Sequence, residues 1–220
     1  AGALFDALDE LDEQFLVIYG DTFLDIDLKS FWEFHQNKKS DASIFLHPND
    51  HPYDSDLVEI NFDDRVNKIH PYPHVNQWHQ NLVNAALYIF NKSSLKGINF
   101  PSDNTDIAKD LFPLMLESKK KIYGYISTEY IKDMGTPKRL IKVENDIKNN
   151  KVSLLKKNIS KIAIFMDRDG TINKEVNHLS SPEKFELIEG VGQAISKINS
   201  KGILSIVVTN QPVISRGDLT

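Results

Sequence analysis

Two aspartates that stand one residue apart could carry out phosphate chemistry. Residues 162–166 have the length and composition of a buried strand, and Asp167-Arg168-Asp169-Gly170-Thr171 turns the chain at its end. Because strict alternation stops where a strand ends, Asp167 and Asp169 can face one small space. Two such close carboxylates repel each other unless a cation neutralises them, and Mg²⁺ prefers oxygen ligands and pairs with phosphate. One metal-bound aspartate could attack phosphorus while the other moves protons, which predicts phosphatase chemistry.

A second polar cluster follows a second apolar run. Residues 203–208 are typical of another buried strand, and Thr209 and Asn210 come directly after it. Apolar residues at helical spacing over 191–198 predict a crossover helix between the two strands, which brings Asp167, Asp169 and Thr209 to one sheet edge. Arg216 is the candidate phosphate-facing cation, because a guanidinium can bind two phosphate oxygens; the alternative is an exposed loop arginine.

These motifs resemble those of a known family. Asp167-Arg168-Asp169-Gly170-Thr171 is similar to the signature of the haloacid dehalogenase-like phosphohydrolases. The whole stretch 162–217, including 209–217, looks most like their heptose-bisphosphate and histidinol-phosphate phosphatase branch. The resemblance implies that Asp167 forms an aspartyl-phosphate, that Asp167 and Asp169 bind Mg²⁺, and that Thr209 and Asn210 bind the phosphoryl group. A lysine and further acidic residues complete the site in that family, and neither motif occurs before Thr220.

Two more aspartates stand at element ends in the first half of the chain. Asp21 follows Gly20 and the predicted strand 15–19, and open α/β sheets bind ligands at the carboxyl ends of their strands. Asp133 precedes Thr136 and Pro137, a hydroxyl N-cap and a proline that predict a helix start. Each aspartate alone is typical of a turn or loop; together they form a second candidate pair.

This second pair also carries a resemblance. Gly20-Asp21, residues 84–90 and Asp133-Met134-Gly135-Thr136-Pro137 together look like the sugar-phosphate nucleotidyltransferases. The resemblance implies that Asp21 and Asp133 hold Mg²⁺ on a nucleoside triphosphate and a sugar phosphate. It also implies that Asn84 contacts the sugar, with Ala85 in place of the family's usual glycine. The family's Gly-rich phosphate loop would precede Ala1, so we expect this module to be truncated.

Strands alternate with helices along the chain, which predicts an α/β fold with two Rossmann-like, parallel-rich modules, both truncated. We expect a nucleotidyltransferase-like domain over 1–147, a Lys- and Asn-rich linker over 148–160 and part of a phosphatase-like domain over 161–220. The predicted elements of the first domain are helix 3–11, strand 15–19, helix 28–37 with Leu28 buried, strand 42–46, hairpin 57–69, strand 82–90, helix 106–117 kinked at Pro113, strand 122–126 and a helix from 137.

Composition narrows the class of protein. The chain has 220 residues, of which 40% are hydrophobic, and lacks the unbroken apolar run of about 20 residues that a membrane span needs. Its net charge of -5 argues against a nucleic-acid partner. The absence of cysteine excludes a thiolate metal site and is consistent with a cytoplasmic location. The histidines are irregularly spaced, which favours loop residues over a metal site: His47, His51, His70, His74 and His79.

The leading hypothesis is a fragment of a bifunctional enzyme of nucleotide-activated heptose synthesis. One module would hydrolyse a sugar bisphosphate and the other would join a sugar 1-phosphate to a nucleotide, with Mg²⁺ as the cofactor. The alternatives are a histidinol-phosphate or general sugar phosphatase beside a transferase of other specificity, and a binding fragment without turnover. We expect the 220-residue piece alone to be inactive.

Overall fold

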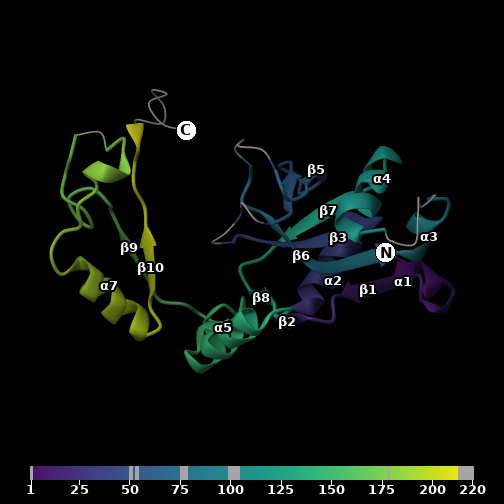
Figure 1. Ribbon diagram of the computed structural model, residues 1–220, viewed down its shortest axis with the longest axis horizontal. Coiled ribbons are helices and arrows are strands. Elements are labelled where there is room, and N and C mark those ends of the chain that lie inside the picture. The colour runs from purple at the N-terminus through teal and green to yellow at the C-terminus, as the bar shows by residue number, and fades with distance from the viewer. Residues whose placement is uncertain are drawn as a thin grey trace. The chain divides into compact units, whose positions relative to one another are not determined.

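The chain folds into two compact units, Ala1–Lys157 and Asn158–Thr220 (Figure 1). The computed structural model describes residues 2–49, 52, 55–74, 79–98, 105–177 and 179–212. The border between the units falls inside the segment 148–160 that the sequence predicts as a linker. Among the described residues no helix is both long and apolar enough to cross a membrane.

A mixed six-stranded sheet forms the centre of the first unit. Its order is β5-β4-β6-β3-β7, and β1 also pairs with β6. Strands β3 and β7 are parallel, whereas β6 runs antiparallel to β1, β3 and β4. Strands β2 and β8 form a separate antiparallel pair. The strands are β1 Gln14–Ile18, β2 Thr22–Asp25, β3 Ala42–His47, β4 Leu57–Ile60, β5 Val66–His70, β6 Val83–Asn91, β7 Ile122–Ile126 and β8 Tyr130–Asp133.

The predicted α/β class is confirmed, but this sheet is mixed, and the expectation of parallel-rich pairing is corrected. Strands β1, β3 and β7 share one direction, and β6 lies between β1 and β3 with the opposite direction. Antiparallel pairing places the first residues of β6 at the edge where β1 and β3 end. An apolar run does not indicate whether its strand is parallel or antiparallel to its neighbours. The sequence therefore did not predict the direction of β6.

Helices cover both faces of the sheet. Alternation along β3 sends Ile44 and Leu46 to one face, where they pack with Phe112 of α4, and Phe45 to the other, where it packs with Phe31 of α2. The helical elements of this unit are α1 Gly2–Asp6, η1 Leu8–Glu10, α2 Leu28–Lys38, α3 Lys92–Leu95, η3 Ile107–Leu111, α4 Phe112–Glu117, α5 Pro137–Lys148 and α6 Lys151–Leu154.

Local capping residues explain where α5 begins. The side chain of Thr136 accepts a hydrogen bond from the Arg139 amide and Pro137 opens α5, as predicted.

The predicted helix 106–117 consists of a π-helical turn, η3, followed by α4. Pro113 lacks an amide hydrogen and so cannot continue regular helical hydrogen bonding from the preceding turn.

Two predicted features of the first unit are corrected. The helix expected over 3–11 is split, because α1 ends at Asp6 and the short 3₁₀ turn η1 follows. Leu28 is 37% exposed rather than buried, since it occupies the first position of α2, outside the packed stripe that holds Phe31 and His35.

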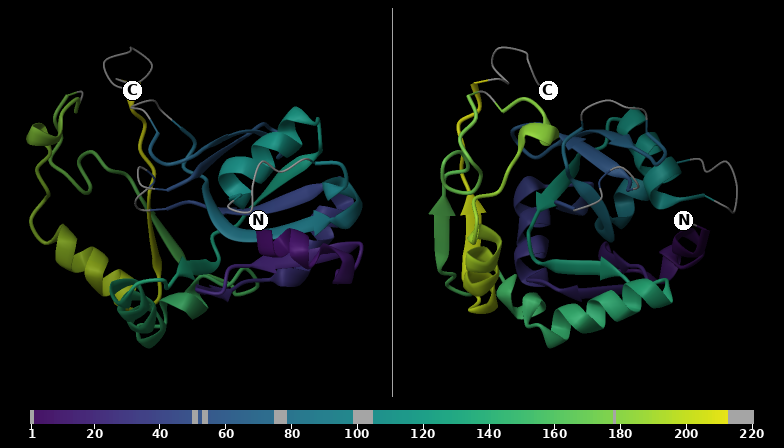
Figure 2. Two further views of the ribbon diagram at one scale, coloured as in Figure 1. Left: turned by 45° about the vertical axis from the view of Figure 1, so that its right-hand side comes forward. Right: turned by 60° about the vertical axis from the view of Figure 1, so that its left-hand side comes forward.

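The second unit contains a strand–helix–strand arrangement. Strands β9 Ala163–Met166 and β10 Leu204–Val207 are parallel neighbours, and α7 Val191–Ser200 runs beside them (Figure 2). The short 3₁₀ turn η4 spans Pro182–Lys184. The two strands are not buried as predicted: Phe165 is 68% exposed and Val207 48%. Two short strands make too small a sheet to cover both of its own faces.

His35 is a buried titratable group of the first unit. Its ring nitrogens lie 2.9 Å from Ser43 Oγ and 3.2 Å from Asn91 Oδ1. Burial lowers the pKa of His35 below its ordinary 6.5, and the hydrogen bond with Asn91 only partly opposes this. Below pH 6.5 the unfolded chain therefore binds a proton at this site more readily than the folded chain does.

We predict that the His35 contribution to stability is complete above pH 6.5 and is lost as the pH falls below 6.5. Urea unfolding between pH 5 and pH 8 should show a shallower pH dependence in His35→Gln than in the wild type. Equal slopes in the wild type and His35→Gln would contradict the prediction.

Candidate functional site

The main candidate site is a pocket of about 830 Å³ in the first unit. It lies where β1 ends, β6 begins and β8 leads into α5. Its lining combines apolar side chains with carboxylates, amides, hydroxyls and several cationic side chains. The residues that line it include Tyr19, Asp21, Asn84, Ala86, Asp133 and Arg139.

Asp21 and Asp133 converge on one point of this pocket. Strands β2 and β8 place Thr22 opposite Asp133, and the Met134 amide donates to the Asp21 carbonyl at 2.7 Å. The Gly135 amide donates to Asp133 Oδ1 at 2.6 Å. A Cβ atom built on Gly135 would lie 2.7 Å from Asp21 Oδ2 and 3.1 Å from Asp133 Oδ1. Both carboxylates therefore face the space directly over Gly135, which an alanine at this position would fill.

Arg139 neutralises one member of this pair. Its Nη1 donates to Asp133 Oδ2 at 2.6 Å, from the first turn of α5. Both side chains are about half exposed, at 52% and 51%. An ion pair in contact with water contributes little net free energy, so another cation could displace the guanidinium at small cost. The sequence interpretation did not include Arg139; its place in the turn after Asp133 was the available signal.

Strand β6 is distorted where it meets the pocket. In the register with β3, Ile44 faces Tyr88 while Leu46 faces Asn84, so β6 contains two extra residues. Asn84 Oδ1 accepts a hydrogen bond from the Ala86 amide at 3.1 Å. Ala86 has φ +54, in the left-handed region that favours glycine, and Ala85 does not. The glycine-like position in this motif is therefore Ala86, which corrects the expectation for Ala85.

Two interacting tyrosines lie beside this distorted segment: Tyr88 of β6 and Tyr19, which directly follows β1. Burial raises the pKa of Tyr88 well above its ordinary value; Tyr19 adds to the shift, and the hydrogen bond with Asn84 opposes it. Burial, and then the Asp106 carboxylate, also raise the pKa of Tyr19, which lines the pocket. Both phenols are therefore neutral hydrogen-bonding groups. Tyr19 looked like the last core residue of a strand, and sequence interpretation did not assign it to the site.

The pair fits a divalent cation in its chemistry. Two carboxylates meeting over a glycine offer oxygen ligands of the kind that Mg²⁺ prefers. No cluster of three or more acidic or histidine side chains able to hold a metal occurs in the described part of the chain. Further ligands would have to come from water or substrate oxygens, as is usual for Mg²⁺ bound with phosphates.

A second candidate site lies at the end of β9 and β10. Their parallel register aligns Met166 with Val207, so Asp167 and Thr209 follow at the same sheet edge. Gln211 Nε2 donates to Thr209 Oγ1 at 2.8 Å and to Asp169 Oδ2 at 3.0 Å. The structure thus brings Asp169 and Thr209 together through Gln211, to which sequence interpretation gave no role.

Arg168 holds the Asp169 carboxylate. Its Nε and Nη2 lie 3.0 and 2.9 Å from the two carboxylate oxygens, and Asn173 Nδ2 adds a bond of 3.2 Å. Partial burial acts to raise the pKa of Asp169, but the hydrogen bonds from Gln211, Asn173 and Arg168 outweigh it, and the pKa is lowered. Asp169 is therefore an ionised carboxylate that already has a cationic partner.

The other predicted residues of this second site are less connected. Asp167 is exposed, and its Oδ1 accepts a bond of 2.6 Å from the Arg168 amide. Asn210 is also exposed, and its carbonyl accepts from Gln211. Arg216 lies outside the described residues. A Mg²⁺ site shared by Asp167 and Asp169 stays a prediction, because the guanidinium of Arg168 takes the position of a cation at Asp169.

The family comparison bears on the first of these two sites. The model of the nucleotidyl transferase family matches residues 1–150, which include Asp21, Asn84 and Asp133. The chain belongs to the nucleotidyl transferase family. The match covers all of the residues that line the 830 Å³ pocket.

Individual relatives of this nucleotidyl transferase agree with that result. A glucose-1-phosphate adenylyltransferase of Clostridium acetobutylicum is 30% identical over 155 residues, which are 67% of this chain and 40% of the relative. HddC from Yersinia pseudotuberculosis, solved in a complex with GMP-PN, superposes with a TM-score of 0.53 at 25% identity and covers 66% of this chain and 61% of its own. The chain thus spans about two fifths of the length of the curated adenylyltransferase.

A different relative matches a shorter stretch. A D-glycero-beta-D-manno-heptose-1,7-bisphosphate 7-phosphatase of Haemophilus ducreyi is 44% identical over 59 residues, which are 27% of this chain and 32% of the relative.

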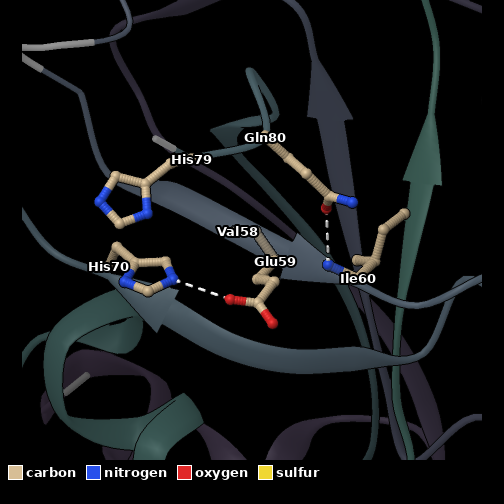
Figure 3. Close-up of a pocket in the computed structure, with 6 residues that line it drawn as sticks. All are labelled: Val58, Glu59, Ile60, His70, His79 and Gln80. Carbon is tan, nitrogen blue, oxygen red and sulfur yellow. Dashed lines mark hydrogen bonds and ion pairs between the residues drawn. The ribbon is translucent and has the colours of Figure 1, made fainter. Parts of the chain in front are cut away.

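The nucleotidyl transferase unit also has a smaller pocket, of about 320 Å³, beside the β4–β5 hairpin (Figure 3). His70 points toward Glu59, with 3.2 Å between Nε2 and Oε2, and the ring centroids of His70 and His79 are 4.2 Å apart. His70 ends β5 and His47 ends β3, so neither is the loop residue that the sequence predicted. His74 lies beyond the strand, with its ring 5.3 Å from that of His79, and His51 lies outside the described residues.

Proposed function

We propose that the first unit is the sugar-phosphate site of a Mg²⁺-dependent nucleotidyltransferase. The observation that carries this proposal is the convergence of Asp21 and Asp133 over Gly135, inside the segment that the family model matches. The adenylyltransferase relative acts on glucose 1-phosphate according to its name, which supports a sugar 1-phosphate as the acceptor. The base of the nucleotide stays open.

The reaction that fits this site forms one bond and breaks one. A phosphate oxygen of the sugar 1-phosphate attacks the α-phosphorus of a nucleoside triphosphate, and pyrophosphate leaves in line. Mg²⁺ held by Asp21 and Asp133 would neutralise phosphate charge and orient the two substrates. Gly135 leaves the space in which both carboxylates meet, and its amide fixes the orientation of Asp133. Tyr19 and Asn84 present neutral hydrogen-bonding groups suited to sugar hydroxyls.

Loss of either carboxylate should remove most of the transfer activity. In the full-length protein we predict that Asp21→Ala and Asp133→Ala each lower kcat/KM at least about 100-fold, because a metal ligand supplies several kcal/mol of charge stabilisation. The assay follows pyrophosphate release from each of four nucleoside triphosphates with a sugar 1-phosphate.

Asp63→Ala is the matched control, because Asp63 is an exposed acid in the β4–β5 turn. It should keep wild-type activity. Unchanged transfer in Asp21→Ala or Asp133→Ala would show that the pair does not hold the catalytic metal.

We further propose that the second unit is part of a sugar-bisphosphate phosphatase, so that the chain belongs to a bifunctional enzyme of nucleotide-activated heptose synthesis. The 59-residue match to a heptose-bisphosphate phosphatase is close in length to this unit, which runs from Asn158 to Thr220. The common edge of Asp167, Asp169 and Thr209 supports the same proposal.

In this reaction an Asp167 oxygen attacks the phosphorus of the substrate, the bond from that phosphorus to the sugar oxygen breaks, and the sugar oxygen takes a proton from solvent water. Water then cleaves the aspartyl-phosphate and releases inorganic phosphate. Asp169, ionised and aligned by Gln211, is placed to accept the proton of that water. Thr209 is the proposed phosphoryl-binding hydroxyl. Asn210, the next residue, and Arg216, further along the chain, are the other proposed phosphate-binding residues.

Asp167→Asn should abolish phosphate release from heptose 1,7-bisphosphate in the full-length protein, because the amide cannot act as the nucleophile. Glu189→Gln, at an exposed acid of the same unit, should leave the rate unchanged. Histidinol phosphate in parallel reactions tests the alternative substrate. Full turnover by Asp167→Asn would contradict the assignment, and absence of turnover with any phosphate ester in the wild type would favour a binding role.

A further inference from the structure

Ala86 has a backbone conformation that is unusual for an alanine inside a strand. Five residues other than glycine have positive φ in the described ranges. Lys39 and Lys119 follow the last turns of α2 and α4, Asn150 lies between α5 and α6, and Asp64 lies in the β4–β5 turn. Helix ends and turns commonly contain left-handed residues. Ala86 is the member of this set that lies inside a strand and is apolar.

The surroundings impose this conformation on Ala86. Between the pairs Ile44–Tyr88 and Leu46–Asn84, the single residue Phe45 faces the stretch of β6 that contains Ala86. The carboxamide of Asn84 then accepts the Ala86 amide hydrogen at 3.1 Å and stabilises the bend. A left-handed alanine is strained because its Cβ crowds the backbone, and glycine would remove that strain.

Strained residues of this kind persist mainly at functional sites. Ala86 is partly exposed, lines the 830 Å³ pocket and is two residues from Asn84. Glycine would give a more relaxed backbone at the same place. Alanine differs from glycine only by its methyl group, so the methyl group is what the strained residue adds to the pocket.

We infer that the methyl group of Ala86 is a specificity determinant that limits the size of the sugar 1-phosphate accepted by this pocket. The inference rests on the proposed nucleotidyl transfer. The neighbouring part of the lining favours a polyhydroxyl ligand, because it contains the uncharged hydrogen-bonding side chains Asn49, Ser55 and Asn84. A methyl group on such a wall excludes substrate atoms that would need its space.

One methyl or methylene group in a pocket changes substrate discrimination by roughly 10- to 200-fold. The test compares kcat/KM of the full-length protein for D-glycero-D-manno-heptose 1-phosphate and mannose 1-phosphate, which differ by one hydroxymethylene carbon. Ala86→Gly should shift the ratio about tenfold in favour of the larger sugar. It should also raise Tm by about 2 °C through relief of the strained backbone.

Lys119→Gly is the matched control. Lys119 has φ +58 and is exposed after α4, outside the pocket lining. Its replacement should raise Tm in the same way and leave the substrate ratio unchanged. Ala85→Gly, in the same motif but without positive φ, should lower Tm, because it adds chain freedom and removes a buried methyl group.

Three results would overturn the inference. A substrate ratio in Ala86→Gly within twofold of the wild type would exclude the specificity role, even if Tm rises. A fall in Tm would exclude the strain on which the inference depends. If neither the wild type nor the variant transfers a nucleotide to either sugar 1-phosphate, the proposed function fails and this inference fails with it.

Discussion

The direction of β6 determines the geometry of the first unit. Because β6 runs against β1 and β3, its first residues lie at the edge where those two strands end. One side of β6 pairs with β3, while its other side pairs with β1 at Leu87 to Asn91 and with β4 only at Val83. Residues 84–86 therefore lie in the break between β1 and β4. This break is where the sheet opens into the pocket, and it is also where β6 is bent.

The two candidate sites share an electrostatic arrangement. In each, one aspartate of a candidate pair is bound by a nearby guanidinium: Arg139 at Asp133 and Arg168 at Asp169. The arginine neutralises the carboxylate and fixes its orientation in the absence of another cation. The two differ in exposure, because Arg139 is about half exposed whereas Arg168 is 21% exposed and also bonds Gln211. Displacement of the guanidinium is consequently easier at Asp133 than at Asp169.

Local signals in the sequence predicted the elements well where the cause is local. Thr136 and Pro137 specify the start of α5 through capping chemistry, and the mainly apolar run over 42–46 identifies β3, which is buried on both faces. The direction of β6 and the left-handed backbone of Ala86 result from pairing with distant strands, so no local pattern contains them. The same limit explains the error on burial in β9, since exposure of Phe165 depends on what else packs on its sheet.

The candidate aspartates could be identified from the sequence, but their hydrogen-bonding partners could not. Position after a strand marked Asp21, Asp167 and Asp169, and position before a helix start marked Asp133. Their hydrogen-bonding partners come from side-chain geometry that spacing does not encode. Arg139, Gln211 and Tyr19 were missed for this reason. Each is an ordinary residue for its local element and gains a role only through its neighbour in space.

The most direct test of metal binding by Asp21 and Asp133 is anomalous diffraction from crystals of the protein soaked in Mn²⁺, a substitute for Mg²⁺ with a strong anomalous signal. We expect a peak within bonding distance of carboxylate oxygens of both Asp21 and Asp133, with Arg139 moved away from Asp133. A peak elsewhere, or no peak with the Arg139–Asp133 pair intact, would contradict the assignment of these two aspartates as the metal-binding pair.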